Sequence, residues 1–517
     1  MKIKLIGMAL KLDEVFPFKL LNLSIKLKFM RNKIIFSLIL CGGIAFSQTI
    51  KKPLVSAIKA EDLKTDIYEM AGNHFNGREA GTLDELKVSM WLANKAKEAG
   101  MAPLGDDGTF FQFFDMYRHQ VTPNTKFKIG KKEFKLWKDV LVAETTNIKV
   151  DAPLVYLGAA TKEEIEKADV KGKVVVLLAS KEGIADDISL FDRRYPGLVR
   201  NKYYDLVVKK GAVALIMVAD ALAEESWSQV EPQMTRGIYG IEGIRDKIGA
   251  TMPVFWVHND QLAYLKITKD LLSTEVVSET YKYPSVNIIG KIEGTDPRLK
   301  NEYVLFSGHQ DHDGVRQKYG QDSIYNGADD NASTCVAMLA IARAYKKQPG
   351  KRTALFVFHG SEERGLLGSR WYSSHPTVPE AAIVAVLNGD MIGRNNVNQA
   401  ALLGSSSPHE NSSDLVAIAK RANDEGPKFD LDKLWDRPEH PEYFYFRSDH
   451  LPYAKRGIPS VFYTSVLHSQ YHTPMDESEN IDFVKLHKMT EWIYRTGWIL
   501  SNDTSRPKTL PNVQLER

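Results

Sequence analysis

Cysteine is almost missing from this 517-residue chain, which contains only Cys41 and Cys335. Cys41 lies in the export signal predicted below, so the mature protein is expected to keep one cysteine and to form no internal disulfide. Cys335 lies in an apolar helical pattern, which is typical of a buried small hydrophobe rather than a nucleophile. We therefore expect packing or metal ions to stabilise the fold.

A strong charge of either sign is also missing. The chain has 68 Lys and Arg against 65 Asp and Glu, for a formal net charge of +3. No block of basic residues with interleaved aromatics is present, so the sequence gives no electrostatic case for binding nucleic acid. No internal repeat or low-complexity tract is evident. With 43% hydrophobic residues, this length is ample for a large core and for more than one domain.

Long hydrophobic runs are absent, and the longest apolar stretch is typical of an export signal. "MRNKIIFSLILCGGIAFSQ" opens at Met30 with basic residues, continues with an apolar run of roughly a dozen residues and reaches a small-x-small pattern. We expect a signal region at 1–47, cleaved after Ser47, and Met30 is a candidate true start. The run is shorter than the about 20 residues that a membrane span needs, and the bulky Leu40 disfavours lipid attachment at Cys41. We expect a periplasmic or secreted protein with no stable membrane span after signal removal.

Three stretches with different sequence patterns follow the predicted signal. Residues 56–100 repeat apolar positions at helical spacing and end on Gly100. Short β-rich runs such as "GKVVVLLAS" and "GAVALIMVA" then alternate with turns and helices, which is typical of a separate α+β module. After 283, near-continuous apolar strands alternate with helices, which is typical of a sheet buried on both faces. We expect an α/β fold, a mostly parallel mixed sheet flanked by helices, built from 48–137 and 283–505, with an α+β insert at 138–282 and a loose tail at 506–517.

Acidic and histidine residues follow the predicted strands at five places. "HQDHDG" follows "EYVLFSG", and "SEERG", "GDMIG" and "YHTPMDE" follow later strands, while "GADDNAST" opens a helix. In such sheets, ligand-binding and catalytic residues lie beyond the carboxyl ends of the strands. Carboxylates and imidazoles that converge without cysteine favour a borderline divalent ion such as zinc. More than three ligands indicate two ions, which need one carboxylate that bridges them.

These five motifs, in this order, resemble those of the co-catalytic di-zinc aminopeptidases. That family includes secreted bacterial leucyl aminopeptidases, with glutamate carboxypeptidase and glutaminyl cyclases as relatives. The resemblance covers about 57–137 and 284–500, and the segment 138–282 resembles the protease-associated domain often inserted in this family. The five motifs together are specific for this family, although each motif alone is weak evidence for it. The resemblance implies two Zn²⁺ per chain and peptide substrates with a free N-terminus.

The resemblance also implies a role for each motif residue. It implies that one zinc is held by His309 and Asp390, that the second is held by Glu363 and His472, and that Asp330 bridges both. The two glutamates of "SEERG" would thus have different roles, with Glu363 binding metal and Glu362 acting as the base.

The proposed base and two supporting residues complete the implied site. The resemblance makes Glu362 the general base, which takes a proton from water and passes it to the leaving amine. Asp311 would accept a hydrogen bond from the imidazole of His309, and Tyr471 would bond the developing oxyanion. Thr334 and Gln310 depart from the usual family residues without removing a ligand.

Several nearby polar residues are expected not to bind metal. Period-two alternation along an extended strand would point His312 away from His309. The other residues set aside as structural partners, core groups or loop scaffolding are Asp313, Asp329, His359, Asp449 and His450.

Three alternative functions stay open at this level. Dipeptidase or carboxypeptidase action is the nearest, although the motifs contain no arginine cluster that would hold a C-terminal carboxylate. Glutaminyl cyclisation is disfavoured by the intact bridging aspartate and paired glutamates. A non-catalytic binding protein would be expected to have lost ligands. The oligomeric state and the preferred N-terminal residue are not predicted.

Overall fold

The computed structural model describes residues 51–516. The predicted signal region and the cleavage after Ser47 therefore lie outside the described residues. Residues from Pro53 onward form one compact unit, which contains two large sheets. Within the part of the chain that is described, no helix has the length and apolar character needed to cross a membrane.

The larger sheet has four parallel strands at its centre, flanked by strands that are mostly antiparallel to their neighbours. Its order is β19-β18-β20-β17-β13-β16-β12-β2-β9, and β1 pairs with β12. This mixed sheet confirms the predicted α/β fold class, while the antiparallel flank was not expected from the sequence. The strands are β1 (Ala102–Pro103), β2 (Phe111–Val121), β9 (Ile238–Ile241), β12 (Ser278–Ile292), β13 (Tyr303–His309), β16 (Thr353–His359), β17 (Ile383–Gly389), β18 (Gln399–Leu403), β19 (Asp430–Leu431) and β20 (Ser460–Thr464).

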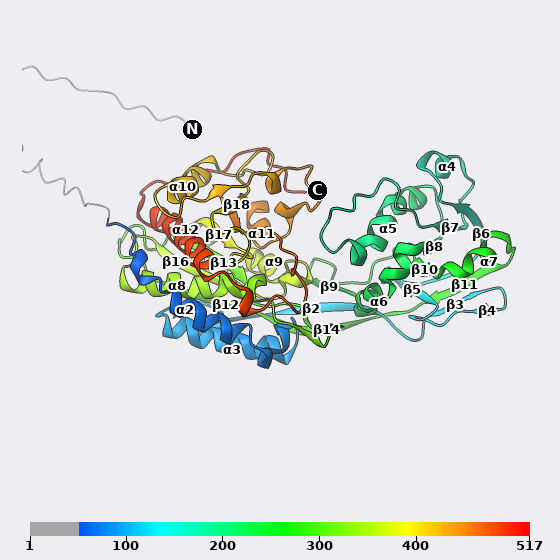
Figure 1. Cartoon of the computed structure of the whole chain (residues 1–517), viewed down its shortest axis with the longest axis horizontal. Coiled ribbons are helices and arrows are strands. Elements are labelled where there is room, and N and C mark those ends of the chain that lie inside the picture. Colours follow the sequence, from blue (N-terminus) through cyan, green and yellow to red (C-terminus); the bar gives the residue numbers. More distant parts are fainter. Residues whose placement is uncertain (1–50, 517) are drawn as a thin grey trace, which may run out of the picture. The chain divides into compact units, whose positions relative to one another are not determined.

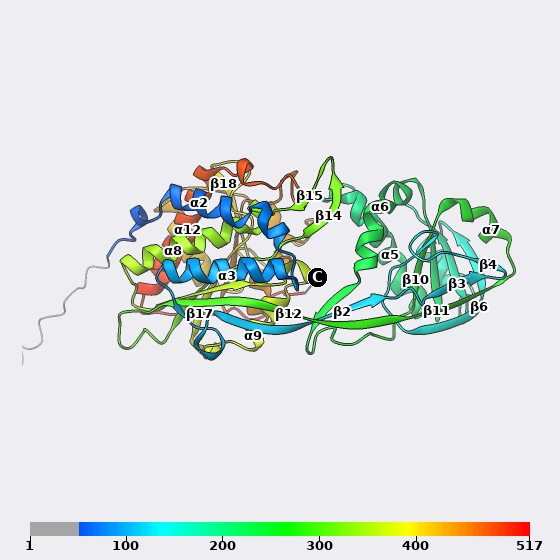
Figure 2. The same ribbon diagram turned by 90° about the horizontal axis from the view of Figure 1, so that it is seen from below.

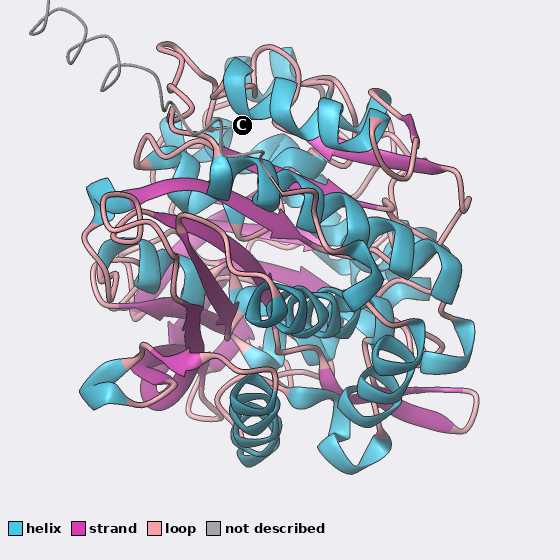
Figure 3. Ribbon diagram, turned by 90° about the vertical axis from the view of Figure 1, so that its left-hand side faces the viewer, coloured by secondary structure: helices cyan, strands magenta, loops and turns pink. Residues whose placement is uncertain are grey.

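Helices cover both faces of this sheet, as Figure 3 shows with strands between helical layers. One face packs against five helices, of which α2, α3 and α8 are visible together in Figure 2. The opposite face packs against the two short helices α9 and α11. The helices are α2 (Ala60–Met70), α3 (Leu83–Glu98), α8 (Ser333–Lys347), α9 (Leu367–Ser374), α10 (Ser413–Asp424), α11 (His450–Lys455) and α12 (Phe483–Asn502).

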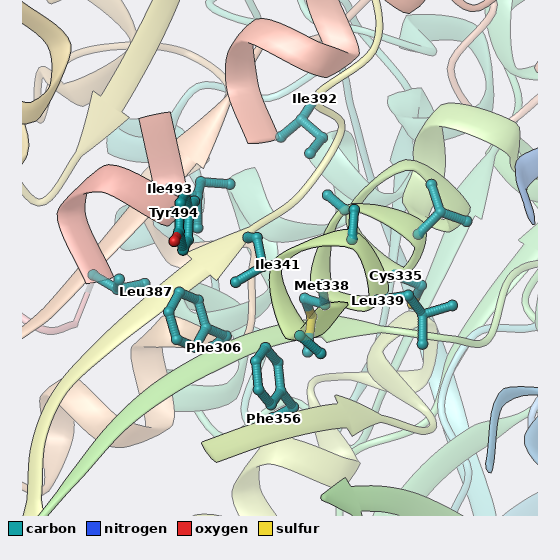
Figure 4. Close-up of a cluster of buried hydrophobic side chains, with 14 of the residues drawn as sticks. Phe306, Cys335, Met338, Leu339, Ile341, Phe356, Leu387, Ile392, Ile493 and Tyr494 are labelled. Carbon is teal, nitrogen blue, oxygen red and sulfur yellow. The ribbon is translucent and has the colours of Figure 1, made fainter. Parts of the chain in front are cut away.

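The core between the sheet and its helices explains the continuous apolar strands. Phe306, Phe356 and Leu387 project from three adjacent strands toward α8 and α12 (Figure 4). Their neighbours along each strand, such as Leu305, are equally buried against α9 and α11. Because both faces are covered, every position of β13, β16 and β17 is apolar or small until the strand ends. The described cysteine, Cys335, is fully buried in α8, as expected.

The second sheet has eight strands in the order β4-β3-β11-β6-β7-β8-β10-β5 (Figure 1). It lies between β2 and β12 in the chain, and these two strands pair over eleven residues up to Val121 and Ser278. The limits of the predicted insert stay a prediction. The elements are β3 (Lys126–Ile129), β4 (Lys132–Glu133), β5 (Val140–Val142), β6 (Ile148–Gly158), α4 (Lys162–Lys167), β7 (Val174–Leu178), α5 (Phe191–Lys209), β8 (Ala214–Val218), α6 (Ala221–Arg236), β10 (Val254–Val257), α7 (Leu262–Ile267) and β11 (Leu271–Val276), and a separate hairpin is formed by β14 (Gly314–Tyr319) and β15 (Asp322–Tyr325).

Candidate metal centre

Four of the five motifs meet because the parallel strands that precede them are neighbours. β13 ends at His309, β17 ends one residue before Asp390, and β16 is followed by the short turn η6 (Glu362–Arg364). The order β20-β17-β13-β16 brings these carboxyl ends to one edge of the sheet. The fifth motif, η5 (Ala328–Ala332), is the turn that leads into α8.

His309, Asp330 and Asp390 form a first group of buried ligand atoms. Their candidate atoms all lie within 4.8 Å of one another. His309 Nε2 lies 3.2 Å from Asp330 Oδ1 and 3.5 Å from Asp390 Oδ1. This is the set that the resemblance implies for one ion, together with the bridging aspartate.

A second group contains Asp330 again, with Glu363 and His472. His472 Nε2 lies 3.0 Å from Asp330 Oδ2 and 3.2 Å from Glu363 Oε1. The two oxygens of Asp330 therefore face different groups, Oδ1 the first and Oδ2 the second. A carboxylate in that position has the geometry that a bridging ligand needs.

His312 also belongs to the second group, which differs from the sequence interpretation. Its Nδ1 lies 2.8 Å from Glu363 Oε1 and 3.9 Å from Asp330 Oδ2. The alternation that was expected to turn His312 away applies only to extended strand, and β13 ends at His309. Three residues beyond the strand, the side-chain direction is set by the loop.

The chemistry of these donors fits divalent metal ions. Several buried ring nitrogens and carboxylate oxygens of the two groups have no hydrogen-bond partner in the described structure, which is costly unless an ion takes that place. The groups carry three carboxylates and no thiol, as borderline ions such as zinc prefer. Although burial lowers it, the nearby carboxylate of Glu363 raises the pKa of His472 to about 10. These atoms, which lie among the members of the two groups, include His309 Nε2, His312 Nε2, Glu363 Oε1 and Asp390 Oδ1.

Glu362 stands beside both groups but belongs to neither. Its Oε2 lies 3.9 Å from His309 Nε2, and its side chain lines a cavity of about 280 Å³ over the site. Burial, together with the neighbouring carboxylates, raises the pKa of Glu362 well above its ordinary value. A carboxylate held off the ligand set and facing the cavity can exchange a proton with a molecule bound there.

Asp311 has a different contact from the one the resemblance implies. His309 Nδ1 lies 3.0 Å from the backbone carbonyl oxygen of Asp311, whereas it is 3.8 Å from the carboxylate. The carbonyl accepts the imidazole hydrogen instead, and this fixes Nε2 as the atom that faces the first group. The Asp311 carboxylate accepts the backbone N–H groups of Glu362 at 2.9 Å and Glu363 at 3.3 Å.

Tyr471 lines the same cavity with its ring against His472, at 3.9 Å between ring centroids. Its hydroxyl oxygen accepts a hydrogen bond of 2.8 Å from Arg447 Nη2. The hydroxyl hydrogen therefore remains free to be donated to a bound molecule.

Two residues without a predicted role hold the ligands in place. The carboxylate of Asp476 accepts the backbone N–H groups of Asp329 and Asp330, each at 3.0 Å to its nearest oxygen. Ser448 donates its hydroxyl to Asp390 Oδ2 at 2.7 Å. Asp476 lies inside the motif "YHTPMDE" and Ser448 lies directly before Asp449, but spacing alone does not assign either residue a contact.

The remaining residues that were set aside lie outside both groups. His359 Nε2 lies 3.1 Å from the hydroxyl of Tyr453, as expected of a core histidine. Asp313 Oδ2 lies 3.1 Å from His472 Nδ1, so this carboxylate orients a candidate ligand. Asp329 Oδ1 accepts the backbone N–H of Gly393 at 2.6 Å. Asp449 and His450 are fully buried.

Comparison with known proteins shows that this chain is similar to peptidases. Residues 287–496 match the model of peptidase family M28. Aminopeptidase YwaD of Bacillus subtilis is 28% identical over 209 residues, which are 39% of this chain and 44% of that protein. Probable leucine aminopeptidase 2 of Aspergillus oryzae is 25% identical over 311 residues, or 58% of each chain. The chain thus spans about half the length of these curated relatives.

Solved structures extend the likeness to most of the fold. An aminopeptidase from Aneurinibacillus sp. strain AM-1 superposes with a TM-score of 0.57 at 19% identity, over 89% of this chain and 97% of that one. A zinc aminopeptidase from Bacillus subtilis gives 0.54 at 17% identity, over 88% and 99%. At this identity the likeness concerns the fold. Together with the sequence matches it confirms the predicted resemblance to co-catalytic zinc aminopeptidases.

Proposed function

We propose that this chain, a relative of the M28 peptidases over residues 287–496, is an exported metallo-aminopeptidase that removes N-terminal residues from peptides. The observation that carries the proposal is the position of Asp330, whose two carboxylate oxygens face two separate groups of ligand atoms. A single-ion or purely structural site has no need of such a shared carboxylate.

Each proposed ion has its own ligands. His309 and Asp390 would hold one zinc and Glu363 and His472 the other, with Asp330 common to both. Two divalent ions supply Lewis acidity, which makes a water more acidic and polarises the scissile carbonyl.

The residues of the chain supply the proton transfers. Glu362 faces the cavity from outside both ligand groups, so it can take a proton from the attacking water at its carboxylate. The protonated carboxyl group can then return that proton to the amine that leaves. The free hydroxyl hydrogen of Tyr471 can be donated to the carbonyl oxygen as negative charge develops there.

Replacing Glu362 by Gln tests this assignment. The amide keeps the size of the side chain but cannot take a proton, so kcat should fall by about 10² to 10⁴ while two zinc ions per chain are retained. Turnover is measured on aminoacyl amides, and zinc by elemental analysis of the same samples. Glu163→Gln, on an exposed side chain of α4, is the matched control and should match the wild type.

The same assay separates the alternatives. The wild type should cleave substrates with a free α-amino group and leave their N-acetylated counterparts intact. Cleavage of acetylated peptides from the C-terminus would instead identify a carboxypeptidase. Normal turnover by the zinc-loaded Glu362→Gln protein would exclude Glu362 as the base.

A further inference from the structure

The cavity over the ligand groups has an arginine wall, formed by Arg193, Arg194 and Arg447. All three residues line the cavity of about 280 Å³, together with the carboxylates and His472. Arg193 and Arg194 lie in the first turn of α5, between β7 and β8 of the second sheet. Arg447 lies shortly before α11. The second sheet segment therefore contributes side chains to the candidate active site.

The arginine wall carries more positive charge than its neighbours neutralise. A single carboxylate oxygen, Glu442 Oε2, accepts hydrogen bonds from Arg194 Nη1 at 2.8 Å and from Arg447 Nη1 at 2.6 Å. Arg193 is half-buried and forms no hydrogen bond or ion pair among the described residues. One glutamate thus faces three guanidinium groups.

The arginine wall is not needed to neutralise the carboxylates of the ligand groups. Asp330, Glu363, Asp390 and Glu362 together carry four negative charges when ionised, which two divalent ions balance. With the ions bound, the arginine wall keeps about two uncompensated positive charges in a confined space. Such a surface attracts an anionic group on the substrate.

A second, larger cavity continues the positive surface away from the ligand groups. It has a volume of about 970 Å³ and shares the three arginines of the wall. It adds Arg200, Arg245 and Lys247, whereas its glutamates, Glu144 and Glu442, are already paired with Arg200 and with the wall. The positive surface therefore extends along the direction that the rest of a bound peptide could follow.

We propose that the arginine wall binds a carboxylate of the peptide substrate, on the side of the scissile bond that leaves. The carboxylate is either the C-terminal group of a short peptide or an acidic side chain beyond the bond. Guanidinium groups hold carboxylates through paired, charge-assisted hydrogen bonds, and Arg193 has its donors free for this. The inference rests on the proposed peptidase function and adds a preference for acidic leaving groups.

Two pairs of matched substrates distinguish the sources of the carboxylate. Ala-Gly is compared with Ala-Gly-amide for the C-terminal group, and Ala-Glu-amide with Ala-Gln-amide for the side chain. We expect the charged member of at least one pair to have a kcat/KM about tenfold higher, mainly through KM. The ratio should fall as salt is added, because the attraction is partly screened. Ratios near one in both pairs would overturn the inference.

Variants assign the preference to the arginine wall. Arg193→Gln should bring the ratio close to one, and Arg193→Glu should invert it. Arg298→Gln is the matched control, since the Arg298 side chain is 86% exposed and does not line either cavity. A ratio that survives in Arg193→Gln would overturn the role of Arg193. If that variant does not fold, a wild-type ratio that is insensitive to salt would overturn the inference as well.

Failure of the proposed function gives a separate result. If the zinc-loaded protein cleaves neither the neutral nor the charged substrates, the peptidase assignment is wrong and the inference falls with it. If it cleaves the neutral substrates with ratios near one, the function stands and only the carboxylate site is rejected.

Discussion

Asp311 and Asp476 hold the candidate site through backbone amides rather than through other side chains. Asp311 accepts the N–H groups of Glu362 and Glu363, and Asp476 those of Asp329 and Asp330. Both carboxylates are fully buried, where such hydrogen bonds are needed to offset the loss of solvent. The family resemblance implies the candidate ligands but not these contacts, because a backbone acceptor or donor carries no signature of its own in the sequence.

His359 should make the folded state sensitive to acid. Burial, aided by the nearby His309, lowers its pKa from 6.5 to about 3, so the folded protein keeps this imidazole neutral. The unfolded chain takes up a proton below about pH 6.5. The free energy of unfolding should therefore fall as pH decreases from about 6.5 to about 3, by as much as about 1.4 kcal/mol per pH unit for this group.

The variant His359→Gln isolates that contribution. It should be less stable at pH 7, since contacts with Asn287 and Tyr453 are altered, but it should lose less stability between pH 6.5 and 4 than the wild type. Urea unfolding at several pH values measures both effects. His375→Gln, at an exposed histidine, should keep the wild-type slope. If the free energy of unfolding of His359→Gln depends on pH as steeply as that of the wild type, His359 is not the source of the acid sensitivity.

At the scale of elements, one buried arginine connects two loops around the site to the end of α2. Arg78 closes the short helical turn η2 (Asn73–Arg78) and is fully buried. Its guanidinium donates to the carbonyl oxygens of Gln310 at 2.8 Å and Gly327 at 3.0 Å, and also to those of Met70 and Asn326. These loops lead from His309 and into η5.

Arg78→Met should destabilise the protein more than an ordinary surface change. The substitution keeps most of the side-chain length but removes the guanidinium donor from four carbonyl groups, of which only that of Gly327 keeps another donor among the described residues, so we expect a loss of about 3 to 5 kcal/mol. Urea unfolding of the zinc-loaded protein gives the value. Arg298→Met, at an exposed arginine, should be close to neutral. A loss below about 1 kcal/mol for Arg78→Met would show that water replaces the guanidinium.

The elements that sequence could predict are those whose environment is uniform along the chain. β13, β16, β17 and β20 are apolar over most of their length because both faces of the sheet are covered, so the polar residues at and after their last positions mark the strand ends. The pairing of β2 with β12 joins segments more than a hundred residues apart, and local pattern does not report it. The position of His312, which was set aside as a ligand, and that of Arg193, which was not singled out, escape local pattern for a similar reason, since loop geometry and packing between distant segments place them.

At the scale of the whole molecule, bound metal should contribute to stability. The two ligand groups bring together carboxylates that repel each other, and an ion that binds only the folded state stabilises it by mass action. Removal of zinc with a chelator should lower the thermal midpoint, and adding zinc back should restore it. His472→Ala removes a ligand from one group only, so it should bind one zinc instead of two. Elemental analysis showing no metal in the active wild type would contradict the two-ion site.

The ladder between β2 and β12 has a consequence for how this protein can change. Val121 and Ser278 are register partners, so the stretch between them leaves the end of β2 and returns to β12 at the same rung, and within that stretch only β9 pairs with the larger sheet, along the other edge of β2. Apart from β9, the intervening stretch 122–277 can thus vary while the loops that carry the candidate ligands stay attached to the parallel strands of the larger sheet. Because the same stretch contains Arg193 and Arg194, which line the cavity, related enzymes can change their substrate preference while they keep the same metal ligands.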